Sequence, residues 1–386
     1  ENFADIVDGV NGKLITDNNY PNNVGVGWDV LSSNTTGYAN TAVGKTALSK
    51  NTTGYQNTAI GTSTLDENTT GFANTGTGYG ALSSNTTGYH NTAIGWAALG
   101  ENKTGNSNTA VGDLALSENT TGAYNTAAGS RALDNNTAGV GNTASGFSAL
   151  YWNTTGDANS AYGYMALYDN ETGYENSATG GFTLYGNITG YQNTATGYKA
   201  LFGNTTGHQN TATGYKVLTD NTTGHSNTAS GYLALMSNTT GYNNTAIGYR
   251  ALTTNTTGHK NTAIGYGADV GANNLENATA VGNQALVDAS NKVRIGDTAV
   301  TVIEGEVAFT SSSDARLKDS ITPVSDGLAL VNDLNPVSYH RTNNPESDIE
   351  MGLLGDLQKM RVENEIKIAR IQEKIGKTRR SAFVGR

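Results

Sequence analysis

Aromatic and imidazole side chains recur along this 386-residue chain in columns of constant spacing, each directly after a glycine. One column reads Tyr38, Tyr55, Phe72, Tyr89, Tyr174, Tyr191, His208, His225, Tyr242 and His259. A second column reads Tyr79, Trp96, Phe147, Tyr164, Tyr198, Tyr215, Tyr232, Tyr249 and Tyr266. Flat rings on a regular surface suit the apolar faces of sugar rings. The run Tyr198, Tyr215, Tyr232 and Tyr249 is therefore a candidate glycan-binding face.

The same columns have other interpretations. The rings could stack on each other, or they could cover a seam between neighbouring chains. His208, His225 and His259 share one column and could suggest a metal site. Neighbouring coils carry Tyr there and no carboxylate stands at ligand spacing, so we expect no metal, and we expect no cofactor.

These columns belong to a repeated unit, best seen at residues 34–50 as NTTGYANTAVGKTALSK. Its opening Asn returns without a slipped residue at 51, 68, 85, 102, 119, 136, 153, 170, 187, 204, 221, 238 and 255. Fixed-period repetition is the signature of a solenoid, and this period is too short for a helix-pair repeat. It predicts an all-β, parallel β-solenoid of 17-residue coils, in which each coil has two short strands and two turns.

Three columns of the repeat vary little. Ala42 recurs as Ala with Gly76 as one exception, and Gly44 and Leu48 recur unbroken to Gly265 and Leu252. The position between Ala and Gly varies from Val to Tyr to Ser. Because side chains alternate faces along a strand, we expect Ala, Gly and Leu inside and the variable column outside. That interior is thin for a coil of this length, so we expect chains to associate side by side.

The turn Asn-Thr-Thr-Gly places Gly at 37, 54, 71 and onward, where we expect a positive φ. The Asn columns that start at Asn34 and Asn40 are expected to form amide ladders between stacked coils. Asn-Thr-Thr is also a glycosylation sequon. We favour the ladder, because the motif follows the structural period.

The composition is unlike that of an ordinary globular protein, with 49 Gly, 4 Pro, no Cys and 15% charged residues. A formal net charge of −10 disfavours nucleic acid as a partner. No apolar run is long enough to span a membrane, and no secretory signal opens the chain. Residues 1–22 precede the repeat and are expected to cap the first coil or to attach the chain to other tail or surface-assembly proteins.

The repeat resembles a known family in residues 23–296. Asn-Thr-Ala-Ile-Gly followed by Ala-Leu is similar to the units of trimeric autotransporter adhesin heads, whose coils are shorter. The resemblance implies a homotrimeric, left-handed parallel β-roll. After Gly265 the register changes, because Gly296 follows Gly282 at a shorter interval than the repeat has.

Residues 297–310 alternate in strand fashion and are interpreted as a neck. In residues 311–350, Ser-Asp-x-Arg-x-Lys followed by Ile-x-Pro and Val-x-Tyr resembles the intramolecular chaperone domain of phage tail spikes, tail fibres and endosialidases. That family trimerises and then cleaves itself with a Ser–Lys dyad. The resemblance implies Ser313 as nucleophile and Lys318 as its base. The alternative is that Ser313 or Asp314 caps a helix.

Residues 351–386 depart from the chaperone pattern, and self-cleavage is in question for that reason. A 4-3 spacing of mostly apolar residues predicts a short coiled-coil helix followed by a basic tail. The seam residues are Leu354, Leu357, Arg361, Asn364, Ile368, Ile371 and Ile375.

The whole pattern indicates a structural trimeric fibre, like a phage tail fibre, that binds a host-surface glycan or protein receptor. The alternative is a bacterial cell-surface trimeric adhesin. The location is accordingly a virion tail fibre or the outside of a cell. Self-cleavage would be its one chemical reaction, since nothing indicates catalysis on an external substrate. A Thr ladder that binds ice is a weaker alternative.

Overall fold

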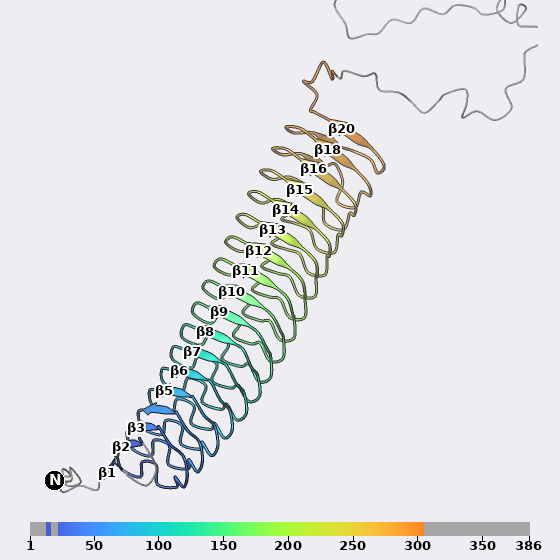
Figure 1. Ribbon diagram of the computed structural model, residues 1–386. Coiled ribbons are helices and arrows are strands. Elements are labelled where there is room, and N and C mark those ends of the chain that lie inside the picture. Colours follow the sequence, from blue (N-terminus) through green and yellow to red (C-terminus); the bar gives the residue numbers. More distant parts are fainter. Residues whose placement is uncertain (1–12, 17–21, 305–386) are drawn as a thin grey trace, which may run out of the picture. The chain divides into compact units, whose positions relative to one another are not determined.

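The computed structural model describes residues 13–16 and 22–304, which form a rod of stacked coils (Figure 1). The strands are β1 (Lys13–Thr16), β2 (Val24–Gly27), β3 (Thr41–Val43), β4 (Thr58–Ile60), β5 (Thr75–Thr77), β6 (Thr92–Ile94), β7 (Thr109–Val111), β8 (Thr126–Ala128), β9 (Thr143–Ser145), β10 (Ser160–Tyr162), β11 (Ser177–Thr179), β12 (Thr194–Thr196), β13 (Thr211–Thr213), β14 (Thr228–Ser230), β15 (Thr245–Ile247), β16 (Thr262–Ile264), β17 (Asp269–Val270), β18 (Thr279–Val281), β19 (Leu286–Val287) and β20 (Val293–Ile295). The coils that contain these strands form a solenoid of about 16 turns.

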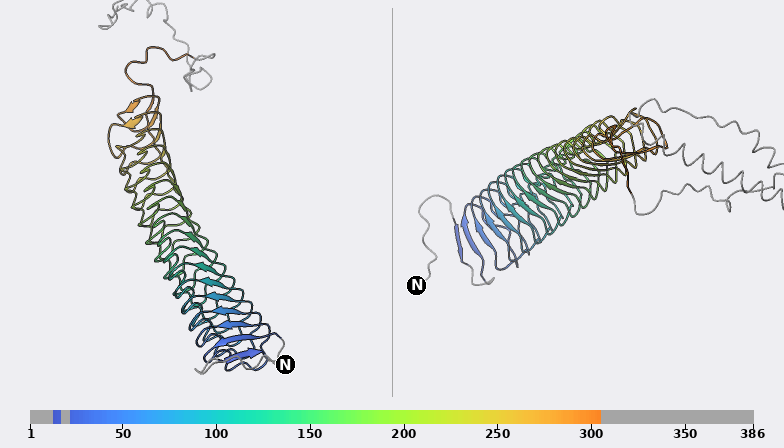
Figure 2. Two further views of the ribbon diagram at one scale, coloured as in Figure 1. Left: turned by 90° about the vertical axis from the view of Figure 1, so that its left-hand side faces the viewer. Right: turned by 90° about the horizontal axis from the view of Figure 1, so that it is seen from above.

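One main sheet runs the length of the rod. Its strands pair in parallel with each residue opposite its own repeat equivalent, as Ala42 lies opposite Ala59 in β3 and β4. Figure 2 shows these strands stacked along one side of the rod. β1 pairs antiparallel with β2 and covers the first edge of the sheet. The predicted all-β parallel solenoid is confirmed.

The end of the array departs from the regular period as predicted. Thr262 of β16 pairs with Thr279 of β18 at the regular interval, but Thr279 pairs with Val293 of β20 at a shorter one. β17 and β19 form a separate two-stranded parallel sheet. The strand expected in the neck is not formed over residues 297–304. Asp297 Oδ1 accepts the Ala299 N–H at 2.9 Å, which turns the chain at that point.

The expectation of two strands in each coil was wrong for the regular coils, which have one. On the other side, Thr46 and Leu48 flank buried Ala47 with φ values of 55° and 54°, which is incompatible with a strand. Their N–H groups bond to opposite neighbours. Thr46 donates to the Trp28 carbonyl at 2.8 Å and Leu48 to the Thr64 carbonyl at 3.1 Å. These inter-coil bonds offset the cost of the left-handed backbone.

The interior is confirmed for two of the three constant columns. In a typical coil Ala42, Ala47 and Leu48 are fully buried, and the variable residue Val43 is exposed. The third assignment was wrong, because Gly44 is only half-buried. Gly44 has φ +132°, and a Cβ there would lie 2.3 Å from the Gly61 carbonyl oxygen. This column is always Gly because the backbone of the next coil approaches too closely for a Cβ atom.

Glycine in the Asn-Thr-Thr-Gly turn also has a different cause from the one expected. Gly54 is not among the residues with positive φ. A Cβ on Gly54 would instead lie 2.3 Å from Asn51 Oδ1 and 2.4 Å from the Gly71 carbonyl oxygen. The turn needs Gly because the asparagine ladder fills the space beside it.

Both asparagine ladders are confirmed. Asn68 Nδ2 donates to Asn51 Oδ1 at 2.7 Å and to the Gly71 carbonyl at 3.0 Å. In the second ladder, Asn57 Nδ2 donates to Asn40 Oδ1 at 3.1 Å. These side chains are fully buried. In the folded coil they are not accessible as glycan acceptors.

Several expectations fall outside this part of the chain. Residues 305–386 include the remainder of the neck, the chaperone-like segment and the coiled-coil seam. Within residues 13–16 and 22–304 the structure contains no helix, and hence none that is long and apolar enough to cross a bilayer.

Candidate functional site

The candidate glycan-binding residues lie together in one stacked ladder on the surface. Tyr198 and Tyr215 have ring centroids 5.6 Å apart, and Tyr215 and Tyr232 are 5.2 Å apart with planes within 5°. Tyr232–Tyr249 and Tyr249–Tyr266 continue the ladder at 5.1 and 4.9 Å. Each ring comes from the residue after the corner glycine of its coil. The one-residue-per-coil spacing therefore sets the stacking distance.

This stacking decides what the ladder can offer a ligand. The faces of Tyr215, Tyr232 and Tyr249 are covered by neighbouring rings, as in the interpretation that the rings stack on each other. These three side chains are nevertheless 40–44% exposed. A sugar would therefore meet edges and hydroxyl groups along most of the ladder. Glycan binding by these residues stays a prediction.

The first aromatic column forms two further ladders. Tyr38, Tyr55, Phe72 and Tyr89 stack at 4.9 Å. From Tyr174 onward the column stacks at 4.6–5.0 Å and includes all three histidines of the column. Residues of both ladders directly follow the Asn-Thr-Thr-Gly turn that precedes the strand, whereas those of the Tyr198 ladder follow the corner glycine after the strand.

His208 and His225 stack with centroids 4.8 Å apart. Burial, followed by the neighbouring His208, lowers the pKa of His225. The residues that the structure describes contain no group of three His, Cys, Asp or Glu that could hold a metal ion. The imidazoles therefore lie in the ladder as flat rings between tyrosines.

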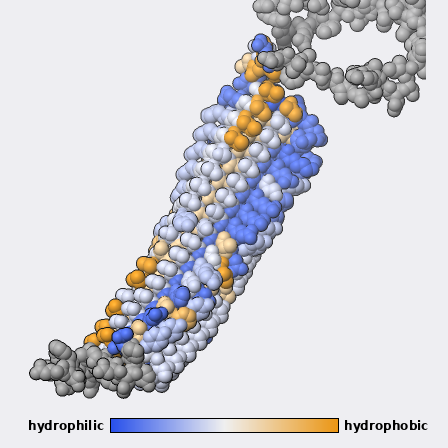
Figure 3. Space-filling view, in the orientation of Figure 1, coloured by the Kyte–Doolittle hydropathy of each residue, from blue (hydrophilic) through white to orange (hydrophobic). Residues whose placement is uncertain are grey.

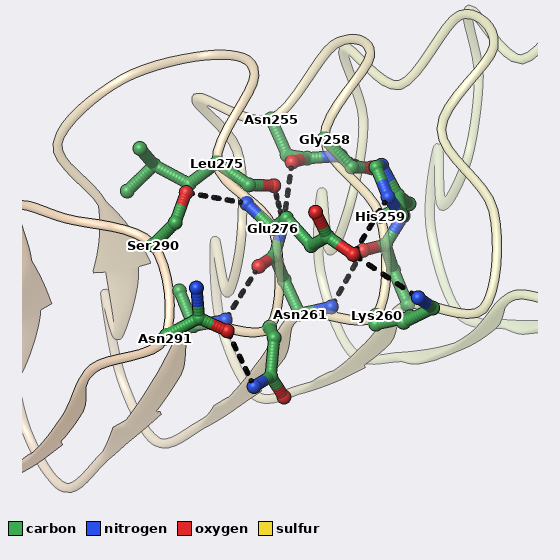
Figure 4. Close-up of polar contacts among 12 residues, drawn as sticks. Asn255, Gly258, His259, Lys260, Asn261, Leu275, Glu276, Ser290 and Asn291 are labelled. Carbon is green, nitrogen blue, oxygen red and sulfur yellow. Dashed lines mark hydrogen bonds and ion pairs between the residues drawn. The ribbon is translucent and has the colours of Figure 1, made fainter.

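His259 lies at the end of the array, where the register changes (Figure 4). The Glu276 carboxylate lies 3.3 Å from His259 Nε2 and 3.0 Å from Lys260 Nζ. The hydrogen bond from Lys260 lowers the pKa of Glu276. The second asparagine ladder ends here, because Ala278 replaces the next asparagine and its N–H donates to Asn261 Oδ1 at 2.8 Å. These contacts close the array, and this explains the position of His259 structurally.

A third aromatic column was missed in the sequence, and we name the ladder that it forms the third ladder, after its column. It consists of Tyr151, Tyr168, Tyr185 and Phe202, which stack at 5.1–5.2 Å. Each of these residues directly follows the buried leucine of its coil, so the signal was available in the column after Leu150.

The third ladder joins the Tyr198 ladder where Gly181 interrupts the latter. Phe182 packs edge-on against Tyr164 at 5.2 Å and Tyr198 at 6.1 Å, and it bridges the gap that Gly181 leaves. Lys199 Nζ lies 4.8 Å from the Phe202 ring centroid and 5.6 Å from that of Tyr198. The result is a continuous aromatic patch with two ammonium groups over it, since Lys216 Nζ lies 5.5 Å from the Tyr215 ring centroid.

The other candidate site, Ser313 and Lys318, lies outside the described residues. The described residues form a β-solenoid rod, and a family match lies in the segment that follows this rod in sequence. Residues 313–354 match the family described as chaperone of endosialidase. This match begins at Ser313, and the expected chaperone domain is confirmed for that segment. No curated protein matches the chain.

Proposed function

We propose that this chain is the subunit of a structural, receptor-binding trimeric fibre, similar to a phage tail fibre, that attaches to a host cell surface. The observation that carries the proposal is the succession of two parts. A solenoid of about 16 turns is followed in sequence by the chaperone-of-endosialidase match at residues 313–354. A rod that stacks through its own repeats suits a spacer or a long contact surface.

In this proposal the C-terminal segment drives trimerisation. Residues 354–375 form a coiled coil, and the assembled rod is a left-handed homotrimer. Ser313 and Lys318 are the proposed dyad for self-cleavage, and the start of the family match at Ser313 supports that assignment. Residues 1–22 attach the fibre to other tail or surface-assembly proteins.

The proposed receptor is a glycan or protein on the host surface, and the fibre is accordingly part of a virion tail. Phenolic hydroxyls and ring edges of the Tyr198 ladder are the proposed contacts, since they are exposed and evenly spaced. Hydrogen bonds to hydroxyl groups and contacts with ring edges are both available to a sugar chain that lies along the rod.

A bacterial cell-surface adhesin is the second candidate, favoured by the resemblance of the repeat to adhesin heads. Electron microscopy of the particle or cell that carries the native protein distinguishes the two. Rods that project from a phage tail support the fibre, whereas rods that project from a cell envelope support the adhesin.

Receptor binding is tested with fluorescently labelled full-length protein on host cells. We expect saturable binding that falls at least tenfold in the double variant Tyr215→Ala/Tyr232→Ala. The matched control is Tyr174→Ala/Tyr191→Ala, which removes two stacked rings from the other column. Equal binding by wild type and both variants would exclude the Tyr198 ladder. Binding no higher than that of an unrelated protein would contradict receptor binding itself.

A further inference from the structure

The outward face of the main sheet carries no charged residue in any of its 17 parallel layers. It consists of two columns, one on each side of the inward-facing residue of each strand, and we name these columns the sheet strip. The inward-facing residue is alanine except at Gly25, Gly76 and Arg294. The column before the alanine is Val24, Thr41, Thr58, Thr75, Thr92, Thr109, Thr126, Thr143, Ser160, Ser177, Thr194, Thr211, Thr228, Thr245, Thr262, Thr279 and Val293. The column after it is Val26, Val43, Ile60, Thr77, Ile94, Val111, Ala128, Ser145, Tyr162, Thr179, Thr196, Thr213, Ser230, Ile247, Ile264, Val281 and Ile295.

The absence of charge is not a requirement of the coil. Residues 22–304 include 27 charged residues among 283, and at that content about three of these 34 positions would be charged. The second column accepts side chains as different as Tyr162, Ser145 and Ile60, so shape does not restrict it. Another exposed column, two residues after the buried leucine, includes Lys50 and Glu67. The sheet strip therefore excludes charge for a reason outside the single coil.

The sheet strip also leaves large apolar side chains in solvent. Most members of its second column are apolar or aromatic, and the others are Ser or Thr. Ile94 and Ile247 are each 43% exposed, and Tyr162 is 46% exposed. In Figure 3 hydrophobic residues gather toward the two ends of the rod, and paler residues lie between them. Exposed apolar side chains that recur along one uncharged face favour an interaction site.

We propose that the sheet strip is the face by which copies of this chain pack together, in parallel and in register, along a common axis. This inference rests on the trimer proposed above and assigns its interface. In a symmetric parallel assembly each residue near the axis lies opposite its own equivalents. A single charged position would then bring like charges together, at a cost of several kcal/mol. Because neither column of the sheet strip contains a charged residue, no layer brings like charges together at the axis.

The area of the sheet strip is consistent with a contact to other copies of this chain. Seventeen layers about 4.8 Å apart extend roughly 80 Å, and a width of about 10 Å gives on the order of 800 Å² on each chain. Stable two-chain interfaces bury about that area on each side, and in a trimer the strip of each chain is divided between two partners. A second copy has the same layer spacing, so its strip can keep contact over the whole length of the rod.

Single cysteines test the assignment in the full-length chain, which contains no natural cysteine. Ile247→Cys lies on the sheet strip, and the control Ile188→Cys lies in a turn with a similar exposed fraction of 38%. With a short bismaleimide we expect covalent dimers from Ile247→Cys and none from Ile188→Cys. Monofunctional maleimide should label Ile247→Cys at least tenfold more slowly than Ile188→Cys in native protein, and equally fast after denaturation.

Charge insertion provides a second test. Ile94→Asp/Ile247→Asp should raise the concentration at which the assembly dissociates at least tenfold, whereas Ile188→Asp should leave it unchanged. A trimer whose Ile247→Cys does not cross-link and is labelled freely would overturn the sheet strip as interface and leave the trimer standing. A wild-type chain that is monomeric, with a reactive Ile247→Cys, would overturn both. In that case the uncharged face would be free for a flat ligand.

Discussion

Two asparagines in each coil stabilise the fold by hydrogen bonding, which adds to the limited stabilisation from the small apolar interior. Asn68 donates from Nδ2 to Asn51 Oδ1 and to the Gly71 carbonyl, and Asn57 makes the corresponding bonds in the second ladder. Each such bond contributes about 0.5–1.5 kcal/mol net, and an unpaired buried amide costs about 1–3 kcal/mol. The thin core alone is therefore weaker evidence for association than we expected, and the uncharged sheet strip is stronger evidence.

At the same scale, His225 makes stability dependent on pH. The lowered pKa means that the folded state binds the proton less tightly than the unfolded state. Stability is therefore complete above the unfolded pKa of about 6.5 and decreases as the pH falls through the folded pKa. We expect thermal unfolding between pH 7.5 and 5 to shift less in His225→Tyr than in wild type. Identical pH profiles would contradict this.

The proposed dyad makes a residue-scale prediction about covalent structure. If Ser313 and Lys318 are competent, mass spectrometry of purified wild type should show two fragments of very unequal size, cut at or beside Ser313. Ser313→Ala removes the nucleophile and Lys318→Ala removes its base, so each should leave the chain whole. Neither variant should prevent trimer formation. An intact wild-type mass after prolonged incubation would leave these residues with a folding role only.

At the scale of the coil, most of the architecture could be predicted because the repeat keeps its register. Ala42 and Leu48 reveal the interior through constancy of small or apolar type. The same constancy misled us at Gly44 and Gly54, since a column is equally constant when backbone or a buried amide approaches it from outside. The left-handed conformation of Leu48 gave no signal, because hydrogen bonds to the neighbouring coil stabilise it and not its own side chain. The third aromatic ladder was overlooked because the column after the leucine is aromatic in only four successive coils.

Packing in the coil predicts unequal effects for two large side chains. Leu150 is fully buried, so Leu150→Ala should cost about 2–5 kcal/mol through lost burial and a cavity. Tyr164 is 48% exposed, and Tyr164→Ala should cost under about 1 kcal/mol. Chemical denaturation followed by circular dichroism measures both. A larger loss at Tyr164 would show that the inside and outside assignments are reversed.

The corner glycines predict a second contrast. Gly129 has φ +140°, and a Cβ there would lie 2.6 Å from the Gly146 carbonyl oxygen. Gly129→Ala should therefore cost more than the roughly 1–3 kcal/mol of backbone strain alone. Gly141 has φ +69° with nothing within 4 Å of a Cβ, and other coils hold Ala158 and Tyr124 in this conformation. Gly141→Ala should cost no more than about 1–2 kcal/mol. Equal denaturation midpoints for the two variants would contradict the corner clash.

At the scale of the whole chain, the solenoid and the C-terminal segment have separate roles. The repeat fixes each coil against the next and leaves an uncharged face, which we propose as the contact with other copies. The segment at residues 313–354 matches a family of chaperones and is proposed to bring three chains together. The sequence indicated both parts. The face proposed for assembly was not foreseen: the variable column was expected outside, but its lack of charge, and that of the Thr41 column, was not used to locate an interface.

Sedimentation equilibrium of the full-length protein at micromolar concentration tests the central claim most directly, with native mass spectrometry as a check on cleavage. The chain has a mass of 40.1 kDa. We predict a single species with three times the mass of the subunit that denaturing mass spectrometry finds, whole or processed. A folded species with the mass of one subunit, and no concentration-dependent association, would contradict the trimeric fibre.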